Sequence, residues 1–135
     1  MAQQEVWPKW IRVSATDVAA PNGLGGKIIG AVGWEGYGRY ITLCQHLSQL
    51  PMATLEVKEP KQLNMPATRL HMTPKSFKAF LAELAAIDAI DPECFAVGRV
   101  FIPGIYEQQR AYLSRVETNT RNVRKRWSQG GSNSS

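Results

Sequence analysis

The sequence predicts a mainly α-helical protein with a small β-wing, and three observations carry this prediction. Apolar residues recur at intervals of three and four along most of the chain, which is the period of an amphipathic helix. A short turn near His71 separates two such stretches. Two short apolar runs around Gly98 then follow, as in a β-hairpin. Two helices joined by a tight turn and followed by a hairpin make a winged helix-turn-helix.

Length and composition indicate one globular domain. The chain has 135 residues, of which 44% are hydrophobic and 20% are charged, so wholesale disorder is excluded. The apolar runs are too short for a bilayer, and we expect no membrane association. Cys44 and Cys94 lie among apolar residues without a CxxC motif, which predicts two reduced core cysteines in a cytoplasmic protein.

Glycines crowd the expected junction between the first two helices. After a short strand or extended arm over residues 10–15, we expect a helix over residues 27–32 and another beginning near Gly36 and Gly38. Glycine costs about 1 kcal/mol in a helix interior relative to alanine, but it permits close approach of another backbone. The first helix is therefore expected to pack tightly across the start of the second, where aromatic rings close the junction.

The first half of the helix-turn-helix follows a brief strand, expected around residues 54–57. Its helix covers residues 63–70, and Pro66 indicates a late start or a kink. His71 is the expected turn residue.

The second half begins with the N-cap Thr73 and with Pro74, whose missing N–H does no harm at the first helical position. Apolar spacing continues this helix to Ile90. The hairpin then comprises residues 95–97 and 100–102 around a turn at Gly98-Arg99.

The basic residues are concentrated in the C-terminal part of the chain. Residues 1–105 contain ten Lys or Arg and nine Asp or Glu, whereas residues 106–135 contain six and two. We expect a final helix from Ile105, a domain boundary at residue 117 and a basic, flexible tail over residues 118–135. Such a tail favours a polyanion partner or serves as a solubilising extension.

The segment "KIIGAVGWEGYGRYITLCQHLSQ" resembles the helix pair in the N-terminal domains of phage and plasmid replication proteins, including replisome organisers and DnaD-type relatives. The specific part is the junction Gly33–Tyr40, and the likeness covers about residues 8–113. His71 stands where that family has a glycine, and Pro66 interrupts a helix that is usually continuous. The resemblance implies DNA binding in the replication of a mobile element, or contacts that assemble a replication complex.

The helix from Thr73 is the candidate recognition helix, since such helices read bases from their N-terminal end in the major groove. Its exposed residues there are expected to be Lys75, Ser76, Lys78 and Ala79, which suit phosphates and base edges. The alternative is an ordinary solvated helix face.

Further basic residues are candidates for DNA contact. Arg99 is expected at the tip of the wing, on phosphate or in a minor groove, or simply exposed for solubility. Arg69 is expected to pair with a carboxylate or a phosphate. The tail cluster, beside Trp127, would bind nucleic acid by counterion release or form a solvated helix end; it comprises Arg121, Arg124, Lys125 and Arg126.

No catalytic or metal-binding motif is recognisable. His46 and His71 have no ligand partners at zinc spacing, and the carboxylates show no pairing for acid-base chemistry. We therefore expect neither an enzyme nor a cofactor.

The sequence favours double-stranded DNA binding in replication initiation or regulation of a phage or mobile element. The alternative is a protein-interaction scaffold of the same fold in a replication complex, which the near-neutral residues 1–105 favour. Host or phage replication proteins are candidate partners. Tyr106, Tyr112 and Leu113 either cover the core of the domain or form a homodimer contact.

Overall fold

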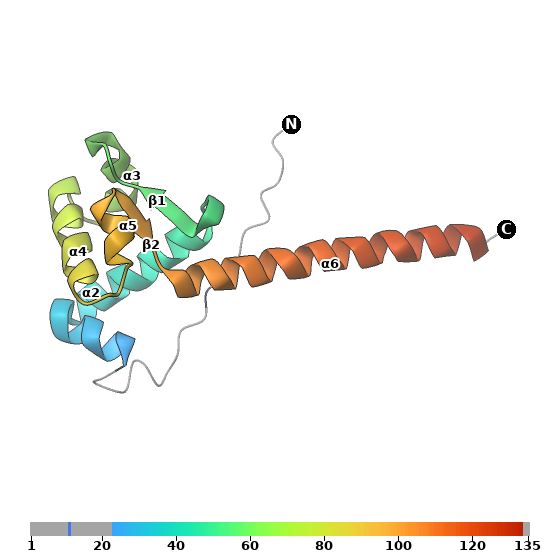
Figure 1. The fold of residues 1–135 in the computed structure, drawn as a ribbon, viewed down its shortest axis with the longest axis horizontal. Coiled ribbons are helices and arrows are strands. Elements are labelled where there is room, and N and C mark those ends of the chain that lie inside the picture. The colour runs from blue at the N-terminus through green and yellow to red at the C-terminus, as the bar shows by residue number, and fades with distance from the viewer. Residues whose placement is uncertain (1–10, 12–22, 134–135) are drawn as a thin grey trace.

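The computed structural model describes residue 11 and residues 23–133, so the arm expected over residues 10–15 lies almost wholly outside the described part. Helices dominate it, with a small two-stranded antiparallel sheet, which confirms the coarser part of the predicted fold class (Figure 1). The elements, with η for 3₁₀ helices, are α2 (Leu24–Ser48), η1 (Pro51–Ala53), β1 (Thr54–Glu56), η2 (Pro60–Leu63), α3 (Asn64–Arg69), α4 (Pro74–Ala86), α5 (Pro92–Ala96), β2 (Arg99–Phe101) and α6 (Pro103–Asn133).

The small sheet joins two strands that lie on either side of the α3–α4 pair in the chain. β1 and β2 run antiparallel, with Leu55 opposite Val100. The hairpin expected around Gly98 is wrong, because residues 92–96 form the short helix α5. The Asp91 side chain accepts hydrogen bonds from the backbone N–H groups of Glu93 and Cys94 and caps this helix.

Helix α2 contains the expected helix pair, with its break at Gly33. This residue has φ 75° and ψ 177°, which glycine adopts without steric cost. The first helix begins at Leu24, earlier than residue 27. Gly36 is buried, and a β-carbon there would clash with the side chain of Val32, at the end of the first helix; the neighbour is thus a side chain and not the backbone that was predicted. Gly38 has open space instead.

The core lies between α2, α3, α4 and the small sheet. The apolar positions of α4 are buried as the periodicity predicts, and Phe77, Leu81 and Leu84 are fully enclosed. Cys44 is buried as expected, whereas Cys94 is half-buried, and both are free thiols. The part of the chain that the structure describes has no helix with the length and apolar character needed to cross a membrane.

The turn between α3 and α4 is built as the sequence indicates. His71 has a φ of 56°, in the left-handed region, and the backbone N–H of Met72 donates to the carbonyl of Ala67. Thr73 caps α4 and Pro74 opens it. The expected extension to Ile90 is wrong: α4 ends at Ala86 because Asp88 takes a φ of 59° and turns the chain.

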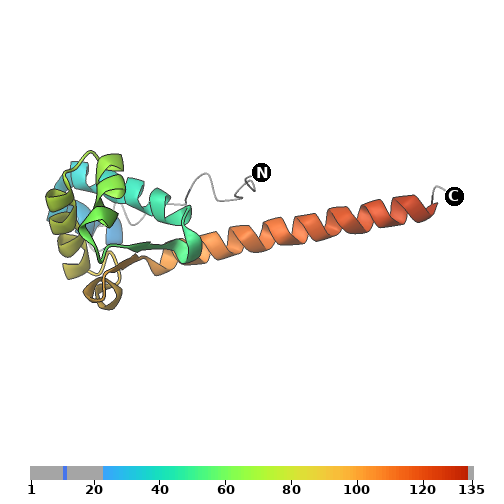
Figure 2. The ribbon, with the colours of Figure 1, turned by 90° about the horizontal axis from the view of Figure 1, so that it is seen from above.

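Helix α6 starts in the domain and then projects away from it (Figures 1 and 2). The side-chain amide of Gln109 donates to the carbonyls of Ser48 and Leu50, at 2.9 and 2.6 Å, and so ties α6 to the end of α2. The helix passes the boundary expected at residue 117 and continues to Asn133. Residues 118–133, expected as part of a flexible tail, are therefore helical.

Candidate nucleic-acid interface

The N-terminal end of α4 presents polar and cationic side chains to solvent. The four residues expected to be exposed there are all exposed: Lys75, Ser76, Lys78 and Ala79. The first turn contains no acidic residue, so the positive end of the helix dipole is not neutralised by a local carboxylate. Because Phe77 and Phe80 on the opposite face are buried, the orientation of this surface is set by the core.

Two arginines hold the turn that precedes α4. The Arg39 Nε donates to the carbonyl of Leu70 at 3.2 Å, and the Arg39 guanidinium also pairs with Glu35 at 2.8 Å. The Arg69 Nη1 lies 3.0 Å from the Nδ1 of His46, so the carboxylate partner expected for Arg69 is replaced by an imidazole. Sequence reasoning missed this role of Arg39, because its partner is a backbone carbonyl distant in the chain.

His46 is a buried, neutral acceptor in this arrangement. Burial lowers its pKa below the usual 6.5, and the neighbouring charge of Arg69 lowers it further. A neutral ring can accept the Arg69 hydrogen bond at Nδ1, whereas a protonated ring cannot. Arg69 therefore serves to join α3 to α2, which weakens its candidacy as a DNA contact.

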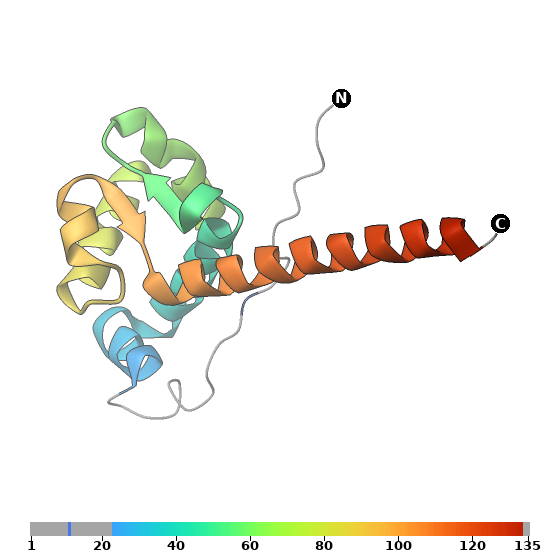
Figure 3. The same ribbon diagram turned by 45° about the vertical axis from the view of Figure 1, so that its right-hand side comes forward.

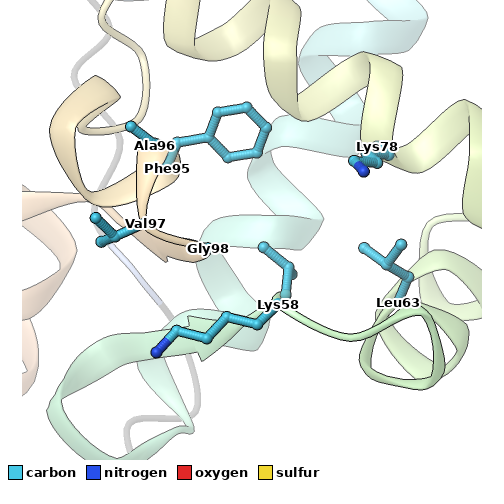
Figure 4. Close-up of a pocket in the computed structure, with 8 residues that line it drawn as sticks. Lys58, Leu63, Lys78, Phe95, Ala96, Val97 and Gly98 are labelled. Atoms are coloured by element: carbon cyan, nitrogen blue, oxygen red, sulfur yellow. The ribbon is translucent and has the colours of Figure 1, made fainter.

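A shallow groove runs beside α4, between it, α5 and the segment after β1 (Figure 4). Its lining is mainly apolar and includes Leu63, Phe95 and Val97, while Lys58 and Lys78 lie at separate parts of its rim. Lys58 was not singled out from the sequence, because its place next to α4 depends on the antiparallel pairing of β1 with β2.

Arg99 does not lie at the tip of a hairpin, which corrects that prediction. It is the first residue of β2, directly opposite Glu56 in the antiparallel register. Its Nε donates to the Glu56 carboxylate at 3.1 Å, and Lys58 approaches the same carboxylate at 3.7 Å. The charge of Arg99 is thus partly neutralised within the domain.

The basic cluster expected to bind nucleic acid lies on the projecting part of α6. Arg121 pairs with Glu117 one turn earlier, at 3.4 Å. Arg124, Lys125 and Arg126 are exposed, as is Trp127, of which 78% is accessible. Helical geometry spreads these cations around the axis, so they do not form one stripe.

Ion pairing separates the cations of the described residues into two sets. Several are neutralised by a carboxylate nearby, namely Arg39, Lys58, Lys61, Arg99 and Arg121. Within the same described residues, no carboxylate pairs with Lys75 and Lys78 on α4, with Lys27 on α2, or with the α6 residues Arg110, Arg115, Arg124, Lys125 and Arg126. The unpaired charge is therefore concentrated on α4 and α6.

The described titratable groups were also considered as a nucleophile and as a metal site. Burial raises the pKa of the Cys44 thiol to about 12, which makes it a poor nucleophile at neutral pH. Within the described ranges, no three His, Cys, Asp or Glu side chains lie close enough together to hold a metal ion.

Comparison with known proteins finds no matching family model, no matching curated protein and no matching solved structure.

Proposed function

We propose that the protein binds double-stranded DNA by placing the N-terminal end of α4 in the major groove. The observation that carries this proposal is the pair of exposed lysines, Lys75 and Lys78, for which the described residues supply no carboxylate partner. Among the described residues of the domain, Arg39, Lys58, Lys61 and Arg99 are already paired with a carboxylate. Phosphate oxygens of a duplex would supply the missing negative charge.

The fold favours this mode of binding. α3, the turn at His71 and α4 have the order and tight connection of a helix-turn-helix, and β1 and β2 flank them in the chain as strands of a winged helix do. Lys75, Ser76, Lys78 and Ala79 would then face bases and phosphates, and the cations of α6 would add affinity independent of sequence.

The biological setting rests on the resemblance of residues 33–40 to replication proteins of phages and plasmids. DNA binding by this chain would then serve replication initiation, or regulation, of a mobile element. A scaffold role in a replication complex is the second candidate, favoured by the near-neutral residues 1–105.

A salt series of duplex-binding measurements tests the proposal. Wild-type protein should bind a random duplex at low salt, with affinity that falls steeply as salt rises. The double variant Lys75→Ala, Lys78→Ala should bind roughly tenfold more weakly and reduce the salt slope by about two.

A matched control separates this site from net charge alone. Lys27→Ala with Lys61→Ala removes the same charge from α2 and η2, and we expect it to retain most of the affinity. Equal losses in both double variants would contradict a site on α4. Absence of binding to any duplex at low salt would favour the scaffold.

A further inference from the structure

The first turns of α6 belong to the core of the domain. Ile105 is buried, Gln109 is enclosed and bonded to the end of α2, and the ring of Tyr106 packs against that of Phe101 with centroids 5.6 Å apart. The apolar contact expected from Tyr106 is therefore made within the chain.

Beyond Gln109 the same face of α6 continues out of the domain, with residues at spacings of three and four: Leu113, Val116, Thr120, Val123 and Trp127. Leu113 and Val116 are half-buried, whereas Thr120, Val123 and Trp127 are exposed. Val123 is 42% accessible and Trp127 is 78% accessible. This is the spacing of the inner positions of a coiled coil, kept here over about two heptads. We name these five residues the α6 seam.

The projecting half of α6 needs stabilisation that its own residues do not supply. It contains β-branched residues and two glycines, all of which lower helix propensity. Most helical stability in proteins comes from packing of an apolar face. A partner along the α6 seam would supply that packing.

We propose that the partner is the α6 of a second copy of this chain, aligned antiparallel over residues 113–130. The seam is self-complementary in this arrangement. Val116 of one helix meets Trp127 of the other, so that the large indole opposes a smaller side chain, and Thr120 meets Val123.

The charges beside the seam fit the same register. Glu117 and Arg124 occupy equivalent positions along one flank of the seam, one heptad apart. In the antiparallel register Glu117 of each copy faces Arg124 of the other, which gives two ion pairs for each dimer. In a parallel pair Glu117 would face Tyr112 of the other helix and Arg124 would face Asn119, so neither would meet an opposite charge on the partner.

The shape of the molecule also suits antiparallel pairing. The domain lies at one end of α6, and the helix leaves it in a single direction in every view (Figures 1 and 3). An antiparallel pair would place the two domains at opposite ends, where they do not compete for space. The overlap is only about two and a half heptads, so association should be weak, with a dissociation constant of roughly micromolar order.

Sedimentation velocity of the full chain, from about 1 to 300 μM, measures this association. The wild type should pass from monomer to dimer as its concentration rises. Val123→Asp places a charge in the seam and should leave only monomer, whereas Asn122→Asp adds the same charge outside the seam and should retain the dimer. A wild type that stays monomeric throughout would overturn the proposal, since the seam would then be covered within one chain.

Charge exchange tests the register. Glu117→Arg and Arg124→Glu should each weaken the dimer about tenfold, because both ion pairs become repulsive. An equimolar mixture of the two variants should dimerise as well as the wild type, since both flanking pairs of the mixed dimer then join a cation on one helix to a carboxylate on the other. A mixture no tighter than either variant alone would exclude the antiparallel register, and circular dichroism of each variant verifies that α6 remains folded.

Discussion

At the scale of single residues, His46 links helix α2 to helix α3, directly before the candidate interface on α4. Its side chain is buried, with only 7% of the residue accessible, and accepts a hydrogen bond from Arg69, while Arg39 holds the end of α3 from the same helix, α2. The position of the turn before α4 therefore depends on a histidine that must stay neutral.

The pH dependence of stability should report this histidine. Its folded-state pKa lies below the usual 6.5, so the folded protein binds fewer protons than the unfolded chain near that pH. Its contribution to stability is complete above about pH 6.5 and is lost as pH falls toward the folded-state pKa. Urea unfolding at a series of pH values measures the effect.

The variant His46→Gln should show a shallower loss of stability than the wild type between about pH 7 and about pH 5, although it is less stable at neutral pH. His71→Gln removes the exposed histidine of the turn and serves as the control, with a pH profile parallel to that of the wild type. An unchanged slope for His46→Gln would show that another group governs the acid response.

Residue-level prediction from the sequence succeeded where one local signal decides the outcome. Thr73 followed by Pro74 identified the start of α4, and the side chain of Thr73 does accept a hydrogen bond from the backbone N–H of Ser76, at 3.1 Å. The partners of Arg69 and Arg99 were not predictable, because they lie 23 and 43 residues away and are brought near by tertiary packing.

At the scale of elements, the break in α2 at Gly33 determines how the first helix crosses the second. The rings of Trp34, Tyr37 and Tyr40 form a chain of contacts next to this break, with centroid distances of 6.4 and 6.5 Å. Gly36 lies on the inner side, against Val32, while Gly38 faces open space. Two glycines so close in the chain therefore have different structural roles.

Alanine substitution should separate the two glycines. Gly36→Ala adds a β-carbon that meets the side chain of Val32, and we expect a loss of about 1–3 kcal/mol in the free energy of unfolding. Gly38→Ala meets nothing and removes unfavourable backbone entropy, so it should stabilise the protein by about 0.5–1 kcal/mol. Chemical denaturation of the two variants checks both signs, and a stabilising Gly36→Ala would contradict the close contact.

The element that was predicted wrongly from the sequence is the hairpin around Gly98. The apolar run at Phe95 and Val97 matched a strand, but Asp91 and Pro92 directly before it are a helix N-cap and first residue, and this signal prevailed. In so short a run, period alone cannot distinguish a helix from a strand. A strand was expected at residues 100–102 and lies at residues 99–101, but its pairing with the distant β1 was not expected.

At the scale of the whole molecule, a nearly neutral domain carries a long basic helix. The sequence predicted this division of charge and the start of the final helix. It did not predict how far the helix continues, because polar residues and two glycines near its end favour coil. The consequence is that two separate surfaces, the start of α4 and the projecting part of α6, carry unpaired positive charge.

These two surfaces should contribute to DNA binding in different ways, and this rests on the proposed function. Lys125 and Arg126 lie outside the α6 seam, so replacing both with glutamine should leave any dimer intact. Because they would contact only phosphates, their loss should reduce the salt slope by about two and weaken every duplex equally. Loss of Lys75 and Lys78 should also reduce discrimination between a selected duplex and a random one. Fluorescence anisotropy with both duplexes, across a salt series, measures slope and discrimination together, and an α6 variant that altered discrimination would refute this division of roles.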